Sequence, residues 1–196
     1  MSEYSTSELM AAVMARELRS GELAIMGAVS ALPQAACRLA IASHAPDLWY
    51  ISGGSGAVNP HGPELIQSSC DQRLLDAETA LPLPEVVLLE GRGDVIDVFF
   101  AGGIEIDATG GCNLVAAGGW ARPKLRGPGG VGLSFLPLGG RVIAYSMTHS
   151  PRTFVEKVGF LSGRGRSTTV VTPLCVFEQE PAAGRLRIRS LHPGVE

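Results

Sequence analysis

The chain has 196 residues, 45% of them hydrophobic, and a formal net charge of −3. This length suits one α/β domain that buries about 70% of its unfolded surface and holds its core without disulfides. An acidic balance without a basic stripe argues against nucleic acid as a partner, and no long apolar run predicts a membrane span.

Cysteine spacing and the N-terminus bear on the compartment. The cysteines lie far apart with no C-x-x-C pair, which favours reduced thiols over a disulfide framework or a zinc site. We expect them to be small buried hydrophobes. The stretch "MSEYSTSELM" lacks the basic and apolar regions of a signal peptide, so the sequence predicts a cytoplasmic protein. The four cysteines are Cys37, Cys70, Cys112 and Cys175.

The first half of the chain predicts a β-α-β arrangement after an initial helix. Ser5-x-x-Glu8 indicates a capping box at the start of that helix, which Gly21 closes. "LAIMGAVS" predicts a short buried strand, Pro33 begins a second helix that ends near His44, and "DLWYIS" predicts the next strand. This order favours a parallel sheet with ligands at the carboxyl ends of its strands.

The rest of the chain alternates between loops and short elements. Residues 57–83 predict a long loop with at most one helical turn. "PEVVLLEGRG" predicts a short helix, "DVIDVFFAGG" a strand, and "EIDATGGCNLV" a hairpin or strand crossing. Three further strands are predicted at 141–149, 168–180 and 185–191. Because no repeat or low-complexity tract appears, we expect a single domain over 1–196.

The stretch Ser52-Gly53-Gly54-Ser55-Gly56 follows an apolar strand, and such a glycine loop usually meets a ligand. It contains no acid, base or thiol. Neither serine stands in a G-x-S-x-G turn before a helix, which argues against an acyl-serine mechanism.

Other motifs are weaker. "GPGGVG" at 127–132 matches G-x-G-x-x-G, but it follows "ARPKLR" rather than a strand and lacks an acid about 20 residues on. The four histidines show no metal-ligand spacing, so no metal site is predicted. The run Gly163-Arg164-Gly165-Arg166 could bind phosphate or form a solvated turn.

Five stretches together resemble one family: "APDLWYISGGSG", "FFAGGIEIDATGGCN", "GPGGVG", "THSPRTFVEKVGF" and "GRLRIRSLHPGV". Their order over residues 8–195 resembles the β subunit of family I CoA-transferases of the glutaconate type. The most specific parts are H-x-x-R-x-F-V-x-K, from His149 to Lys157, and the terminal "LHPGV". In character the chain is most similar to β subunits of ring-opening CoA-thioester hydrolases of steroid breakdown.

The resemblance implies an open, mostly parallel α/β sheet with helices on both faces, of the NagB/RpiA/CoA-transferase type. It also implies an α subunit of the same family, in a heterodimer or heterotetramer, and an acyl-CoA thioester as substrate with no permanently bound cofactor. Relatives of this family carry a further C-terminal segment after the last motif.

In the transferases a glutamate stands in the loop that matches Ser52 to Ser55, and its carboxylate attacks the thioester. Here Gly54 is the best match to that glutamate, and Gly53 is the other candidate. The resemblance therefore implies no catalytic residue on this chain. The family turn D-x-x-G-N-x-N is also altered, because Gly111 replaces one asparagine while Asn113 is retained.

Two classes of function remain open. The chain is either the β half of a two-subunit enzyme, most simply a hydrolase of the C–C ring-opening type whose acid and base come from the α subunit, or a non-catalytic acyl-CoA-binding scaffold for the α chain. A true transferase that uses a glutamate elsewhere is the third reading. Three glycine clusters favour an enzyme. The residues expected to contact the acyl-CoA are Ser52, Gly53, Gly54, Ser55, Gly102, Gly103, Asn113, Gly127, Gly129 and Gly130.

Overall fold

The structure is a computed structural model that describes residues 4–27 and 31–196. The chain forms two compact units, Met1–Phe100 and Ala101–Glu196. The single domain over 1–196 stays a prediction. The predicted strand "LAIMGAVS" extends into residues 28–30, which lie outside the described residues.

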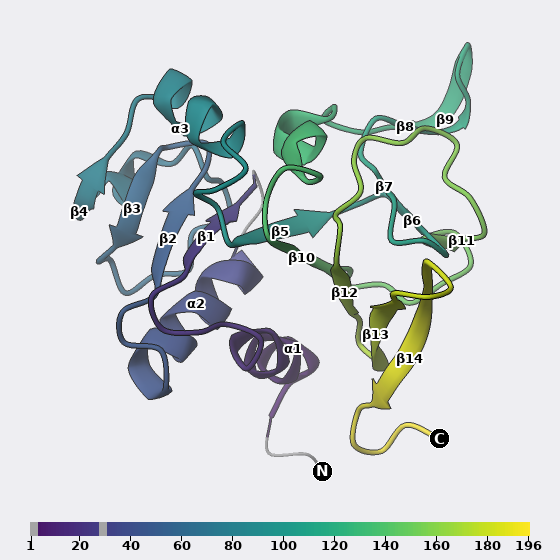
Figure 1. The fold of residues 1–196 in the computed structure, drawn as a ribbon, viewed down its shortest axis with the longest axis horizontal. Helices are drawn as coiled ribbons and strands as arrows, with labels where there is room; N and C mark the ends of the chain where they lie inside the picture. Colours follow the sequence, from purple (N-terminus) through teal and green to yellow (C-terminus); the bar gives the residue numbers. More distant parts are fainter. Residues whose placement is uncertain (1–3, 28–30) are drawn as a thin grey trace. The chain divides into compact units, whose positions relative to one another are not determined.

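The first unit begins with the predicted capped helix α1 (Thr6–Ala15). Glu8 N donates to Ser5 Oγ over 3.2 Å, and Ser5 N donates to Glu8 Oε2 over 2.7 Å, so the capping box is confirmed. The helix ends well before Gly21, whose φ of +82° belongs to the turn into the first strand. Helix α1 packs against α2 (Ala31–Ser43) (Figure 1).

The sheet of the first unit has parallel strands at its centre. Strand β1 (Leu23–Met26) pairs in parallel with β2 (Trp49–Ser52) on one side and with the first residues of β5 (Val98–Gly102) on the other. The crossover from β1 to β2 contains α2, as the β-α-β pattern predicted. The short helix α3 (Leu83–Glu90) precedes β5, and this prediction is also confirmed.

Residues 57–83 are not the long loop that the sequence predicted. They contain β3 (Ala57–Pro60), the 3-10 helix η1 (Gln72–Leu75) and β4 (Ala77–Ala80). Strand β3 pairs antiparallel with both β2 and β4. The sequence hides these strands because they are stabilised by main-chain pairing at the margin of the sheet. Their alanines, Asn59 and Pro60 have low β-propensity.

The second unit holds four strands in the order β14-β13-β12-β10. Strands β10 (Arg141–Tyr145) and β12 (Thr168–Val171) are parallel, whereas β13 (Cys175–Glu180) and β14 (Arg185–Leu191) add antiparallel pairs. The single strand predicted at 168–180 is therefore two. Pro173 explains the break, because it has no N–H to continue a ladder.

Short strands and a 3-10 helix complete the second unit. Strand β6 (Glu105–Asp107) pairs antiparallel with β7 (Cys112–Asn113) and in parallel with β11 (Phe154–Val155). Of the two predicted arrangements, a hairpin or a strand crossing, the structure shows the hairpin. Strands β8 (Ala116–Gly119) and β9 (Arg122–Arg126) form a separate ribbon, and η2 covers Val131–Phe135 (Figure 1).

The stretch "ARPKLR" is mostly the strand β9, so "GPGGVG" does follow a strand, contrary to the sequence prediction. Charged residues and Pro123 obscured this strand, whose residues are largely exposed. It belongs to a two-stranded ribbon rather than to a β-α-β unit, so the motif lacks the structural context of a dinucleotide site.

Candidate functional site

The glycine loop is a tight turn at the carboxyl end of β2. Gly56 N donates to Ser52 O over 2.8 Å, and Gly53 N donates to the last residue of the neighbouring parallel strand, Met26 O, over 3.0 Å. Gly56 has a φ of +70°, and a Cβ there would clash with Leu81 O, so only glycine fits. Sheet geometry and chain connectivity thus fix the loop at a strand end, where the sequence placed it.

At both positions matched to the family glutamate, an added side chain would meet atoms of other residues. A Cβ on Gly54 would clash with Ser69 Oγ and would lie 2.8 Å from Cys70 Sγ. A Cβ on Gly53 would lie 2.9 Å from the backbone oxygen of Met26. The loop therefore contains no carboxylate, and Ser69 and Cys70, from a later segment of the first unit, lie beside Gly54.

Two buried hydroxyl groups near this loop lack partners. Ser52 is fully buried and Ser69 is 1% exposed, yet neither Oγ atom has a hydrogen-bond partner within the described part of the chain. The amides of Gly54 and Ser55 likewise form no hydrogen bond with any described residue. Ser55 Oγ donates to Ser52 O over 3.2 Å and so stays inside the turn. The loop and the neighbouring Ser69 thus combine main-chain donors and hydroxyl groups that have no partner among residues 4–27 and 31–196.

The cysteines do not share one environment. Cys37, Cys112 and Cys175 are buried, as predicted, but Cys70 is exposed, so the prediction is wrong for this residue. Burial raises the pKa of the Cys112 thiol to about 12, with the charge of Asp107 adding to the effect. Nothing in the sequence "SSC" at 68–70 distinguished Cys70, because its exposure depends on the turn that leads into η1.

The first unit also has an apolar cavity of about 320 Å³. Leu23 and Trp49, which begin β1 and β2, line it, together with residues such as Leu81 and Leu89. It therefore lies at the amino ends of these strands, whereas the glycine loop lies at their carboxyl ends. Its lining offers little for polar chemistry.

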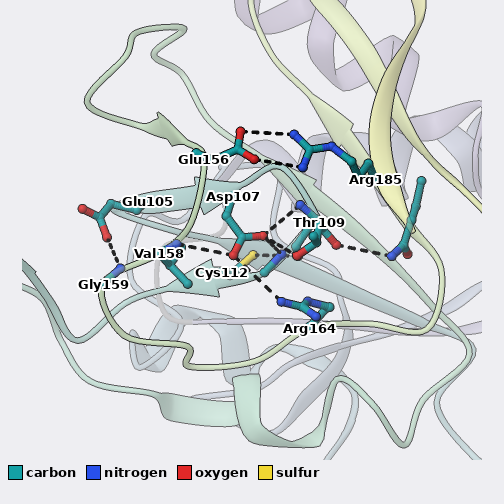
Figure 2. Close-up of polar contacts among 12 residues, drawn as sticks. Glu105, Asp107, Thr109, Cys112, Glu156, Val158, Gly159, Arg164 and Arg185 are labelled. Carbon is teal, nitrogen blue, oxygen red and sulfur yellow. Dashed lines mark hydrogen bonds and ion pairs between the residues drawn. The ribbon is translucent and has the colours of Figure 1, made fainter. Parts of the chain in front are cut away.

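In the second unit, Asp107 organises the turn between β6 and β7 (Figure 2). Its Oδ1 accepts hydrogen bonds from Thr109 N, Thr109 Oγ1 and Gly111 N, at 2.6–2.9 Å. Its Oδ2 accepts from Val158 N and lies 3.9 Å from the Arg164 guanidinium. Burial opposes ionisation, but the Thr109 hydroxyl and these backbone N–H groups outweigh it and lower the pKa of Asp107.

The predicted contact residue Asn113 is fully buried and fully hydrogen-bonded within the chain. Its Nδ2 donates to Glu105 Oε2 over 2.7 Å and to Ala116 O over 2.8 Å. Its Oδ1 accepts from Val115 N and Ala116 N. Asn113 therefore orients the segment that follows β7. A direct contact with the acyl-CoA stays a prediction.

The structure separates the predicted glycines of the second unit into two kinds. A Cβ on Gly103 would lie 2.7 Å from Glu105 O, and a Cβ on Gly127 would clash with Leu114 O, so both allow close backbone approach. Gly102, Gly129 and Gly130 have open space where a Cβ would stand. Gly103 and Gly127 thus pack around the segment that contains Asn113, while the open glycines could face a ligand.

The two most specific family motifs meet at Thr172. His149 Nδ1 lies 3.0 Å from Thr172 Oγ1, and His192 Nε2 lies 2.8 Å from Thr172 O. The His149 ring also contacts Phe154, with ring centroids 5.0 Å apart. These histidines hold the turn between β12 and β13. In residues 4–27 and 31–196, no group of three or more His, Cys, Asp or Glu side chains could hold a metal ion.

No protein-family model matches the sequence. One 3-oxoadipate CoA-transferase subunit, from Pseudomonas knackmussii, is 32% identical over 215 residues, which cover all of this chain and 80% of that protein. The chain belongs to the family I CoA-transferase β subunits. The predicted family and its α/β fold are therefore confirmed.

Solved structures agree with this assignment. The decarboxylase AibA/AibB is 30% identical to this β subunit over 98% of the chain and 80% of its own, with a TM-score of 0.85. Glutaconate CoA-transferase from Acidaminococcus fermentans is 22% identical over 99% of this β subunit and 82% of its own chain, with a TM-score of 0.86. IpdAB from Rhodococcus jostii RHA1 is 24% identical over 99% of this β subunit and 80% of its own chain, with a TM-score of 0.80. The last two show the fold alone.

Proposed function

We propose that this chain is the β half of a two-subunit enzyme that cleaves a C–C bond of a 3-oxoacyl-CoA thioester and delivers the acyl group to water. The observation that carries the proposal is the loop at Gly54. A transferase of this family needs a carboxylate there, but residues 52–56 contain no acid, and Ser69 and Cys70 lie where a side chain on Gly54 would begin.

The loop still offers what hydrolysis requires. Hydrolytic C–C cleavage of a 3-oxoacyl group needs a base, a positioned water and donors for the oxyanion that develops on a carbonyl oxygen. The amides of Gly54 and Ser55 are donors of that kind, because they form no hydrogen bond with the described residues. The base is assigned to the α subunit. Contacts of Gly102, Gly129 and Gly130 with the acyl-CoA stay a prediction, and a Cβ at each of these positions would meet no described atom within 4 Å.

Assembly is the first test. Alone, the chain is expected to show little activity, and with its α partner it is expected to form an αβ heterodimer or a heterotetramer. Light scattering of the two chains separately and mixed measures this. A fully active monomer of this chain contradicts the proposal, and an α subunit that is equally active without this chain contradicts a catalytic cleft between subunits and supports the scaffold reading.

The acyl acceptor is the second test. The complex is incubated with 3-oxoadipyl-CoA in isotopically labelled water, with glutarate added as a competing acceptor. Hydrolysis places the label in the released succinate and forms no glutaryl-CoA. Borohydride, which reduces an enzyme-bound glutamyl thioester to an alcohol, is then expected to modify no Asp or Glu of this chain. Glutaryl-CoA or a reduced carboxylate on this chain supports the transferase instead.

The glycines at 129 and 130 provide a third test. A Gly130→Val side chain meets no described atom within 4 Å of its Cβ, so the fold is expected to tolerate it. We expect binding of an acyl-CoA to the complex to weaken, which calorimetric titration measures. Unchanged affinity in a folded complex means that this loop does not face the thioester.

A decarboxylase is the second candidate, and the observation that favours it is the 30% identity to AibA/AibB over 98% of the chain. Loss of CO₂ from an acyl-CoA also develops charge on the thioester oxygen, so the same amide donors would serve it. Glutaconyl-CoA distinguishes the two reactions. Release of CO₂ with formation of crotonyl-CoA supports the decarboxylase, and cleavage of 3-oxoadipyl-CoA without CO₂ supports the hydrolase.

A further inference from the structure

Cys70 places a thiol, a reactive nucleophile, beside Gly54. The point where a Gly54 Cβ would stand lies 2.8 Å from Cys70 Sγ and is also too close to Ser69 Oγ for a side chain to fit without movement. The thiol therefore lies within a side chain's length of the loop, although it comes from a segment that follows β3. No residue inside the loop itself can act as a nucleophile other than its serines.

A short hydrogen-bonded turn holds Cys70 in this place. Cys70 N donates to Ser68 Oγ over 3.3 Å, and Asp71 N donates to Ser68 O over 3.1 Å. Asp71 then caps η1, because its carboxylate accepts a hydrogen bond from Arg73 N over 3.0 Å. The backbone on both sides of the thiol is therefore fixed, while its side chain remains exposed.

An independent observation points to a ligand at the same place. Ser69 is 1% exposed, and its Oγ faces the side-chain position of Gly54 without a partner in the described chain. An unpaired buried hydroxyl destabilises the folded state, because it has lost its bonds to water and gained none in the protein. Ser52 Oγ, at the start of the loop, is also buried and has no partner among the described residues. A polar ligand at Gly54 would give the Ser69 hydroxyl a hydrogen-bond partner.

We propose that Cys70 is the nucleophile of this subunit and carries the acyl group between cleavage and hydrolysis. This inference rests on the proposed function and names the group that acts first. The Cys70 sulfur bonds to the 3-oxo carbon of the acyl-CoA, and the C2–C3 bond breaks. Its electron pair goes to C2 as the enolate of the remaining CoA thioester.

The remaining steps return the enzyme to its starting state. The enolate carbon takes up the proton lost from the thiol and becomes a shortened acyl-CoA, while the other fragment stays on Cys70 as a thioester. Water then attacks that thioester, which releases the acid and returns a proton to the sulfur. Starting from 3-oxoadipyl-CoA, the fragment on Cys70 is succinyl and the released thioester is acetyl-CoA. No oxidant or second cofactor enters.

The other three thiols serve as internal controls because all are buried. Burial raises the pKa of Cys37 and of Cys112, and it also raises the pKa of Cys175 against the opposing hydrogen bond with Thr172. In the folded protein, alkylation and acylation are therefore expected at Cys70 alone.

The experiment uses the complete complex with its α partner. Calorimetric titration first establishes that the complex binds 3-oxoadipyl-CoA or glutaconyl-CoA. Iodoacetamide is then added with and without the bound thioester, and peptide mass spectrometry follows each cysteine. We expect the thioester to slow alkylation of Cys70 at least fivefold, and acid quenching during turnover of 3-oxoadipyl-CoA to reveal succinyl on Cys70.

Two variants complete the test. Cys70→Ala is expected to lose the acylated peptide and at least a hundredfold in turnover while keeping its affinity for the thioester. Cys175→Ala is the same change at a buried thiol and is expected to keep the acylated peptide. If the complex binds the thioester but Cys70 is alkylated at an unchanged rate, or if Cys70→Ala turns over normally, Cys70 is not the nucleophile. The proposed hydrolase survives that result. A complex that binds no CoA thioester overturns both.

Discussion

Two glycine-rich turns end strands in this chain, and they are built on opposite principles. The turn from Asp107 to Asn113 is organised by a buried charge. Every side-chain oxygen and nitrogen of Asp107 and Asn113 has a partner within the chain. The loop from Ser52 to Gly56 has no charged side chain. Ser52 Oγ has no partner within the described ranges, and neither has Ser69 Oγ, which lies near Gly54.

The difference separates stability from ligand binding. A carboxylate that accepts several backbone N–H bonds fixes a turn and has little capacity left for a ligand. Buried hydroxyl groups without partners destabilise the fold, and each can form a hydrogen bond with a polar ligand. Both turns contain glycines, so glycine content alone did not distinguish the structural turn from the candidate site.

The largest expected effect is at Asp107. Replacing it in Asp107→Ala leaves several buried N–H groups and the Thr109 hydroxyl without an acceptor, so unfolding of the complex in urea should become easier by roughly 2–4 kcal/mol. The control is Glu156→Ala, which removes only an exposed ion pair with Arg185. Equal losses in the two variants would show that the turn does not depend on its charge.

A smaller effect is expected at Gly54. The Cβ of Gly54→Ala would clash with Ser69 Oγ, so the variant should be destabilised by about 1–3 kcal/mol. Gly62→Ala is the matched control, since its Cβ meets nothing within 4 Å. Adding Ser69→Ala to Gly54→Ala should recover part of the loss, because the clashing hydroxyl is removed. Thermal unfolding of wild type, Gly54→Ala, Ser69→Ala and the double variant gives a double-mutant cycle that measures this coupling.

Acid should destabilise the turn that Asp107 organises but not the loop from Ser52 to Gly56, which has no charged side chain. The pKa of Asp107 is lowered from its ordinary value of 3.8, so its ionised form stabilises the folded state. That contribution is complete above pH 3.8 and is lost as the pH falls through the lowered pKa of the folded state. Urea unfolding of wild type and Asp107→Asn at pH 7 and pH 3 measures this. The stability gap between them should narrow in acid, and a constant gap would contradict an ionised Asp107.

The smallest effect on stability is expected from Ser69→Ala. Because the hydroxyl has no partner in the described chain, its removal should leave the free energy of unfolding unchanged or raise it by up to about 1 kcal/mol. Affinity for an acyl-CoA should fall at the same time. A clear loss of stability without any loss of affinity would mean that Ser69 supports the fold and not a ligand.

Most strands and helices of this fold could be predicted from local patterns. The capping box at Ser5 and Glu8, the β-α-β order around α2 and the strand at 185–191 each carry a strong local signal. The prediction failed where pairing occurs without a side-chain pattern, as in β3 and β4, which are rich in alanine and include a proline. Main-chain hydrogen bonds at a sheet margin do not require β-branched residues.

The candidate site was predictable only in part. The loop at Ser52–Gly56 follows from an apolar strand that runs into glycines, and the loss of the carboxylate follows from a family pattern. The occupants of the vacated space, Ser69 and Cys70, could not be predicted, because they approach Gly54 through the fold of an intervening segment. Likewise, only the structure shows that the side-chain amide of Asn113 already donates to Glu105 Oε2 and Ala116 O.

The hairpin of β13 and β14 has a consequence for the order of folding. Its strands pair from Cys175↔Leu191 to Glu180↔Arg185 across a short connection, so its contacts are close in sequence. The parallel pairs of β1 with β2 and β5 join residues much farther apart, with whole helices between them. Hairpins form within about 1–10 μs, whereas such distant pairs must first close long loops. We therefore expect the C-terminal hairpin to be ordered early, and the sheet that carries the glycine loop to be completed late.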